Sequence, residues 1–218
     1  MITPDLASEW YTSPDPVHDF NHIMRVYRMA RYLGVLEGAD LDIVLPAALL
    51  HDAGGNGPDL AAARKEHHIR SAAFAAEILK VHDYSTDQIE KIQHCIRAHR
   101  FRSVEEKPAT IEAMVVFDAD KLDSIGAVGV ARAIAYAAIS GKPFYFPPST
   151  QFITTGELAP GEPHSAYHEY LVKLSKIKGR MFTNSGKKIA KERHQYMVAF
   201  FNKLHSEWES AESTANGE

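Results

Sequence analysis

The sequence IVLPAALLHD, residues 43–52, is the most apolar stretch of the chain and ends in a histidine and an aspartate. Its first eight residues are apolar on nearly every side of a helix, which is typical of a helix buried at the centre of a domain. Asp42 is a candidate N-cap, and the glycines at positions 54 and 55 predict that the helix ends near Ala53. We therefore expect a central helix that delivers His51 and Asp52 into an apolar interior.

Helical periodicity continues on both sides of this segment. Residues 17–37 place apolar side chains at helical spacing and are followed by Gly38, and Ser85 begins a capping box before a helix that runs to about Arg100. No stretch alternates in the manner of a convincing strand, so the predicted fold class is all-α. The further helices that we expect are residues 59–81 with a break near His67, 111–125, 126–140, 165–178 and 185–209.

Two segments do not fit a helix. Residues 141–163 are rich in proline, glycine and aromatic residues and predict a long non-helical loop. Loops of this length inside a compact domain are uncommon and often functional, so we expect this one to cover the site. Residues 210–218 are polar and predict a disordered tail. The sequence thus predicts a single domain over residues 1–209.

Composition narrows the class of protein. With 45% apolar and 24% charged residues among 218, the chain can bury a globular core. Its longest apolar run, residues 43–50, is far shorter than the roughly 20 residues that span a bilayer, and the N-terminus does not resemble a signal peptide. We therefore expect no membrane partner. The single cysteine, Cys95, cannot form an internal disulfide, so we predict a cytoplasmic protein. The net charge of −4 argues against a nucleic-acid partner, and the oligomeric state stays open.

Three places along the chain combine acids or histidines with an apolar setting. His22 lies near the start of the first long helix, His51 and Asp52 end the central helix, and residues 118–123 (DADKLD) follow the apolar residues 114–117. A buried ionised carboxylate costs several kcal/mol unless it is paired or binds a metal. Each residue alone also fits a satisfied core histidine or a capping aspartate. Together, imidazole and carboxylate suit one divalent cation, with Mn, Fe, Co, Ni, Zn and Mg as candidates.

The order His22, His51–Asp52 and Asp120 resembles the H…HD…D signature of the HD-domain metal-dependent phosphohydrolases. Residues 22–26 (HIMRV), 47–52 (AALLHD) and 118–132 (DADKLDSIGAVGVAR) are similar to blocks of the YpgQ/YedJ-like bacterial HD hydrolases. The similarity runs over residues 19–208. It implies an HD-type helical fold with a buried central metal site.

The resemblance implies that His22, His51, Asp52 and Asp120 are the metal ligands. Helical spacing places Asp118 and Asp120 on different stripes and does not choose between them. Only the family pattern selects Asp120, with Asp118 as a supporting or structural acid.

Further residues are candidates for the chemistry around the metal. Asp52, Asp123 and His99 are the expected catalytic groups, because a phosphohydrolase must orient a water and move protons. Arg25, Lys121 and Arg97 are the expected phosphate-binding cations, since negative charge develops on the phosphoryl oxygens. Arg25 also fits a surface cation, and His99 also fits a histidine at the edge of the core. Some HD proteins bind two metals through additional histidines, and here the candidates for a second metal are His67 and His99.

The expected function is the metal-dependent hydrolysis of a small phosphorylated compound, with a nucleotide as the expected substrate. In its most specific form, the resemblance implies cleavage of a nucleoside triphosphate to a monophosphate and pyrophosphate. Two alternatives stay open: a non-catalytic sensor that binds a metal and a nucleotide, and a di-metal HD oxygenase.

Overall fold

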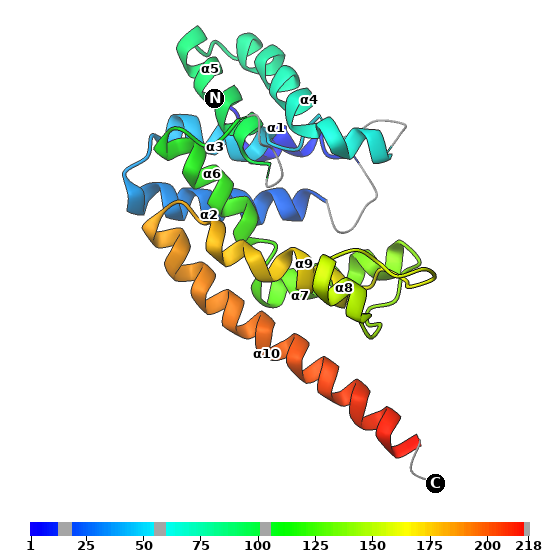
Figure 1. Ribbon diagram of the computed structural model, residues 1–218. Helices are drawn as coiled ribbons and strands as arrows, with labels where there is room; N and C mark the ends of the chain where they lie inside the picture. The colour runs from blue at the N-terminus through cyan, green and yellow to red at the C-terminus, as the bar shows by residue number, and fades with distance from the viewer. Residues whose placement is uncertain (13–18, 55–59, 101–105, 216–218) are drawn as a thin grey trace. The chain divides into compact units, whose positions relative to one another are not determined.

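The computed structural model describes residues 1–12, 19–54, 60–100 and 106–215, and within them every regular element is a helix (Figure 1). The predicted all-α fold class is therefore confirmed for the described part of the chain. In chain order, the helices are α1 (Pro4–Ser8), α2 (Phe20–Glu37), α3 (Leu41–Leu50), α4 (Leu60–Val81), α5 (Thr86–Ala98), α6 (Ile111–Leu122), α7 (Gly126–Ile139), α8 (Thr150–Thr155), α9 (Ala166–Val172), the 3₁₀ helix η1 (Leu174–Arg180) and α10 (Asn184–Ala215).

The chain divides into two compact units. The first contains Met1–Asp123 together with Met181–Lys187, and the second contains Ser124–Arg180 and the chain from Lys188 onward. Residues 141–163 belong to the second unit. That this segment covers the site, and that residues 1–209 form one domain, stay predictions.

Helix α3 lies at the centre of the first unit. It packs against α2, α5 and α6, while α4 packs on α5. Leu49 and Leu50 are fully buried, as is Val44. Burial of a leucine side chain contributes about 1.5–3 kcal/mol, so the apolar run ending at His51 stabilises this arrangement directly. The predicted central helix is confirmed.

Local capping determines where the helices of the first unit begin and end. The Ser85 capping box is present, and Gly38 ends α2 with a left-handed φ of 68°. The N-cap of α3 is Asp40 rather than Asp42, because the Asp40 carboxylate already accepts from the backbone N–H of Asp42 at 2.9 Å. Helix α4 is kinked at Glu66, beside the expected break at His67. The start of α2 expected at residues 17 and 18 lies outside the described residues.

The second unit departs from the sequence prediction in three places. Within the expected loop, α8 forms because the Ser149 hydroxyl caps the backbone N–H of Phe152 and Gly156 ends the turn in the left-handed region. The helix expected over 165–178 leaves α-geometry after Val172 and continues as η1. The tail expected to be disordered is helical through Ala215, since extending an existing helix needs no new nucleation. Residues 216–218 lie outside the described part.

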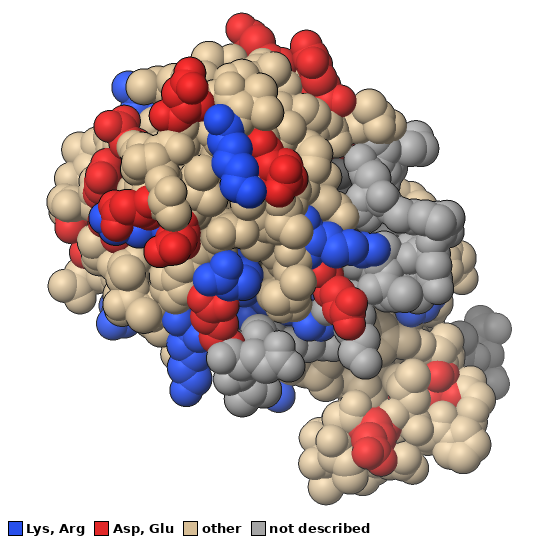
Figure 2. Space-filling model, turned by 90° about the horizontal axis from the view of Figure 1, so that it is seen from above, with Lys and Arg blue, Asp and Glu red and all other residues tan. Residues whose placement is uncertain are grey.

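Surface composition agrees with the modest net charge. The face seen in Figure 2 carries acidic and basic side chains interspersed with uncharged ones. Among the described residues no single helix is both long and apolar enough to cross a membrane, although the bent pair α6 and α7 reaches that length and composition jointly.

Candidate metal centre

The end of α3 prepares His51 as a ligand. His51 is the C-cap of the helix, and its Nδ1 donates to the carbonyl of Ala48 at 2.8 Å. Because a carbonyl only accepts, this hydrogen bond places the proton on Nδ1 and leaves a lone pair on Nε2. The Nε2 atom is buried and has no hydrogen-bond partner in the part of the chain that the structure describes. A buried, unpartnered lone pair is costly unless a ligand occupies it.

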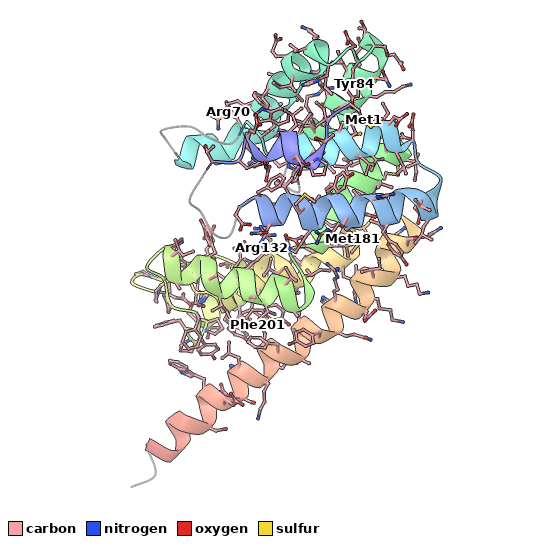
Figure 3. All side chains as sticks on the ribbon, turned by 180° about the vertical axis from the view of Figure 1, so that it is seen from behind. Met1, Arg70, Tyr84, Arg132, Met181 and Phe201 are labelled. Carbon is pink, nitrogen blue, oxygen red and sulfur yellow. The ribbon has the colours of Figure 1, made fainter. Side chains whose placement is uncertain are left out.

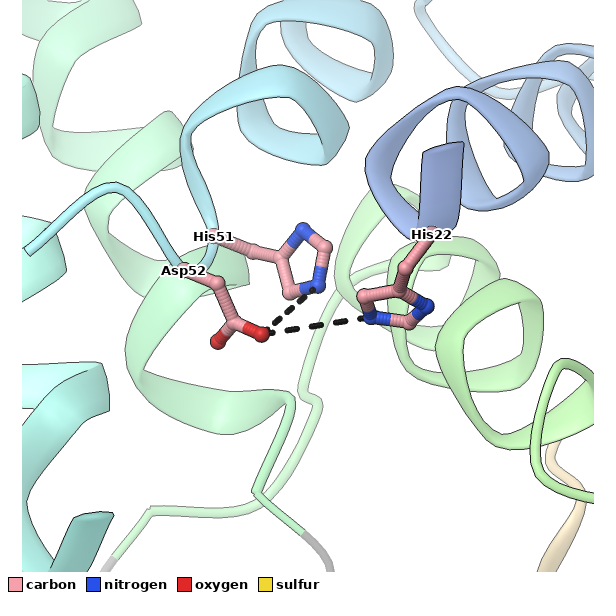
Figure 4. Close-up of side chains that lie close together, drawn as sticks. All are labelled: His22, His51 and Asp52. Atoms are coloured by element: carbon pink, nitrogen blue, oxygen red, sulfur yellow. Dashed lines mark ion pairs between the residues drawn. The ribbon is translucent and has the colours of Figure 1, made fainter. Parts of the chain in front are cut away.

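Four donor atoms from three elements face the same centre. Figure 4 shows His22 from α2 pointing toward His51 and Asp52. The Nε2 atoms of His22 and His51 lie 3.9 and 3.6 Å from Asp52 Oδ2. They lie 3.6 and 4.0 Å from Oδ1 of Asp120, which comes from α6. Two imidazole nitrogens and two carboxylate oxygens in a largely buried position fit a divalent cation.

A second layer of contacts orients His22. Its Nδ1 lies 2.7 Å from Asp123 Oδ2, and the Arg25 guanidinium holds the same carboxylate through Nε at 2.7 Å and Nη2 at 3.0 Å. The hydrogen bond to Asp123 raises the pKa of Arg25. A carboxylate behind a ligating histidine fixes the ring and raises its basicity. The structure thus brings Asp123 and Arg25 together behind His22, while their expected catalytic and phosphate-binding roles stay predictions.

The two acids of α6 face different surroundings. Asp120 directs Oδ2 to the ammonium of Lys121 at 2.5 Å. Burial opposes ionisation of Asp120, but Lys121 and the nearby imidazoles outweigh it and lower its pKa. Asp118 instead accepts the backbone N–H groups of Phe182 and Thr183 at 3.0 and 2.8 Å. The structure therefore brings Asp120, and not Asp118, to the cluster.

Comparison with known proteins groups the chain with one family. The HD domain model matches residues 19–125, a range that holds His22, His51, Asp52 and Asp120. The Bacillus subtilis protein YpgQ is 32% identical over 194 residues, which cover 87% of this chain and 84% of YpgQ. The chain belongs to the HD-domain superfamily. The predicted family and the predicted similarity to YpgQ are both confirmed.

Several solved structures have the same fold. The crystal structure of B. subtilis YpgQ in complex with ADP has a TM-score of 0.71 at 32% identity, covering 94% of this chain and 97% of that one. A Lactobacillus plantarum protein has a TM-score of 0.73 at 28% identity, covering 96% and 100%. An HD-superfamily hydrolase from Bacillus thuringiensis has a TM-score of 0.67 at 29% identity, covering 94% and 93%.

The HD aspartate also faces a second pair of histidines. Asp52 Oδ1 lies 3.4 Å from His67 Nε2 and 3.6 Å from His99 Nε2, and these two nitrogens are 3.2 Å apart. The side chains can hold a metal ion by their geometry. Asp52 thus directs one oxygen to each pair of histidines. Burial opposes its ionisation, but His51, His67, His99 and His22 together lower the pKa of Asp52.

His99 is oriented in the same way as His51. It is the C-cap of α5, and its Nδ1 contacts the carbonyl of Ile96 at 2.5 Å. Burial and then the neighbouring His51 lower the pKa of His99 to about 3, so its imidazole is neutral near pH 7. A neutral ring with its proton on the backbone side offers a lone pair to the cluster. The expected role of His99 as a proton donor stays a prediction.

Arg97 does not join the HD cluster. Its Nε and Nη2 hold the carboxylate of Glu106 at 2.6 and 3.2 Å, and His94 Nδ1 contacts the same carboxylate at 2.5 Å. Positions 97 and 99 lie about 200° apart around a helix, so Arg97 projects away from the face that carries His99. The structure therefore does not support the expected phosphate contact for Arg97.

Sequence analysis missed Tyr11. Its hydroxyl donates to the carbonyl of Leu49 at 2.7 Å, at the end of α3. Burial and then the charge of Asp52 raise the pKa of Tyr11, so the hydroxyl keeps its proton. No periodicity marks this residue, because it follows the short helix α1 and precedes residues outside the described part.

Proposed function

We propose that this HD protein is a metal-dependent phosphohydrolase acting on nucleotides. The convergence of His22, His51, Asp52 and Asp120, with the buried lone pair of His51 left without a partner, carries the proposal. Support for a nucleotide comes from the similar YpgQ structure, which contains ADP. The proposed reaction converts a nucleoside triphosphate and water to a monophosphate and pyrophosphate.

The residues of the cluster have different roles in the proposed reaction. A bound divalent cation would supply a water of lowered pKa and a positive charge for the phosphoryl oxygens. Asp52 stays ionised because the surrounding imidazoles lower its pKa, so its carboxylate can accept a hydrogen bond from the attacking water. Lys121 places an ammonium beside Asp120, where it can also attract an anionic substrate.

Release of products tests the proposal directly. Metal-stripped protein receives each divalent cation in turn, and inorganic phosphate and pyrophosphate are measured separately over a panel of nucleotides. We expect pyrophosphate and monophosphate in equal amounts from a triphosphate. Asp52→Asn should abolish release, while Asp42→Asn, an exposed acid on α3, should leave it unchanged. Phosphate alone would indicate a phosphomonoesterase, and binding without any release would indicate a sensor.

The contacts of Asp52 with His67 and His99 favour a second candidate, a two-metal site that would also be compatible with oxygen chemistry. Elemental analysis distinguishes the one-metal site from the two-metal site. A two-metal protein should hold two equivalents per chain and lose one in His99→Ala, whereas His94→Ala on the same helix should lose none. One equivalent in all three proteins would restrict the site to a single metal. The cytoplasmic location and the absence of nucleic-acid and membrane partners stay predictions.

A further inference from the structure

The turn that carries the HD dipeptide is held by side chains as well as by the backbone. Helix α3 ends at Leu50, and the last carbonyls of a helix lack the usual partners four residues on. The Ala48 carbonyl accepts from the His51 ring, and the Leu50 carbonyl accepts from the backbone N–H of Ala53 at 3.2 Å. The carbonyl of Leu49 lies between these two acceptors.

One phenol connects Leu49 to Asp52. The Tyr11 hydroxyl donates to the Leu49 carbonyl at 2.7 Å, and the backbone N–H of Asp52 faces the same phenol, where it favours the ionised form. In a 3₁₀ turn, the N–H of residue 52 would bond directly to the carbonyl of residue 49. Here the Tyr11 hydroxyl contacts both residues instead.

The ring of Tyr11 also contacts the element that carries His22. Its centroid lies 5.6 Å from that of Phe20, the first residue of α2. His22 is two residues further along the same helix. Tyr11 thus touches both the HD turn and the start of the helix that supplies the next ligand.

We propose that Tyr11 is a positioning residue that sets the direction of the Asp52 carboxylate. Asp52 directs Oδ2 to His22 and His51 and Oδ1 to His67 and His99, so a rotation of its backbone would misplace both oxygens at once. The hydroxyl binds the carbonyl of Leu49, three residues before Asp52, from a residue 38 positions before Leu49 in the chain. This inference rests on the proposed metal site.

A matched pair of variants tests it. Tyr11→Phe keeps the ring and its contact with Phe20 but removes the hydroxyl. Tyr84→Phe is the control, because its hydroxyl also bonds to the backbone, accepting from the N–H of Ile2 at 3.2 Å, and it holds the same N-terminal segment (Figure 3). Mn²⁺ dissociation constants are measured by electron paramagnetic resonance of free Mn²⁺, with circular dichroism to confirm folding. We expect Tyr11→Phe to weaken Mn²⁺ binding about 10-fold, the usual effect of losing an outer contact to a ligand.

Hydrogen exchange of the Asp52 amide provides a readout that needs no metal. In metal-free protein, Tyr11→Phe should speed exchange at Asp52, and Tyr84→Phe should leave it unchanged. Equal Mn²⁺ affinities in wild type and Tyr11→Phe would overturn the inference, as would equal losses in both variants. A wild-type chain that binds no metal would refute the proposed function. The exchange rates would then still decide whether Tyr11 holds Asp52: faster exchange in Tyr11→Phe alone supports this, and an unchanged rate overturns it.

Discussion

Two aspartates on α6, separated by one residue, have opposite surroundings. Asp120 faces the histidines, whereas Asp118 is fully buried and binds the backbone of Phe182 and Thr183. Asp120→Ala should lose the metal and keep most of the stability. Asp118→Ala should keep the metal but lose about 1–3 kcal/mol of unfolding free energy, because the backbone N–H groups of Phe182 and Thr183 lose their acceptor. Elemental analysis measures the metal content, and urea unfolding measures the stability. If Asp118→Ala lost the metal and Asp120→Ala kept it, Asp118 would be the ligand and Asp120 the structural acid.

Arg25 is expected to bind phosphate, and its contacts in the structure suggest an experiment on that role. Its guanidinium holds Asp123, which in turn contacts His22. If Arg25 acts through His22, Arg25→Ala should reduce turnover of a triphosphate and of an aryl phosphate by the same factor, about 10-fold or more. Steady-state kinetics on the two substrates provide the comparison. A larger loss on the triphosphate would instead assign Arg25 to the distal phosphates.

Helix ends, more than helix faces, build the centre. His51 follows α3, His99 follows α5, and each directs Nδ1 to the carbonyl three residues earlier. The carbonyls at a helix C-terminus have no partner within the helix, so a histidine at the C-cap can satisfy one and aim its other nitrogen outward. The same local chemistry therefore orients ligands on two different elements.

In the second unit, one carboxylate fixes the loop around α8. Glu162 accepts from the backbone and hydroxyl of Ser149 at 2.7 and 2.6 Å and lies 3.0 Å from His168 Nε2. Burial opposes ionisation of Glu162, but these hydrogen bonds outweigh it and lower its pKa to about 2. A carboxyl whose pKa is lowered by folding contributes stability that is full above its unfolded pKa, about 4.3, and is lost as the pH falls toward 2.

Glu162→Gln should therefore flatten the pH dependence of stability between about pH 4.5 and 2. Thermal unfolding at a series of pH values measures the slope. Glu157→Gln, an exposed residue of the same segment, is the control and should keep the wild-type slope. An unchanged slope in Glu162→Gln would show that this carboxyl does not contribute to acid unfolding.

At the scale of the whole molecule, the HD unit is not continuous in sequence. The family model ends at residue 125, but the first unit also takes in Met181–Lys187. Phe182 contacts Phe117 with ring centroids 5.0 Å apart, and its backbone N–H binds Asp118. The free energy of unfolding of a native domain is only about 5–15 kcal/mol. Removing residues 181–187 should therefore lower the stability of the first unit substantially.

A fragment of residues 1–125 should accordingly fold poorly, because the Asp118 carboxylate stays buried without its donors. Circular dichroism and urea unfolding, compared with the full chain, test this. Asp118→Ala should destabilise the full chain and not the fragment, since the fragment has already lost the partners. A fragment as stable as the full chain would make the 181–187 segment dispensable.

Sequence by itself determined the helical class and the buried helix that ends at His51 and Asp52. These follow from local rules: apolar periodicity, capping residues and the spacing of side chains on a helix. The same rules misplaced the N-cap of α3 by two residues, because the neighbouring aspartates Asp40 and Asp42 can both cap a helix. They also missed α8, because a short helix has only a weak sequence pattern.

Only the tertiary structure decided how the functional groups pair. Arg25 binds Asp123, Arg97 binds Glu106, and Tyr11 reaches the HD turn. Each of these choices depends on which side chain from a distant part of the chain arrives at an otherwise unsatisfied polar group. A buried donor or acceptor must find a partner, but its sequence neighbours do not indicate which one, because the partner is supplied by packing between helices.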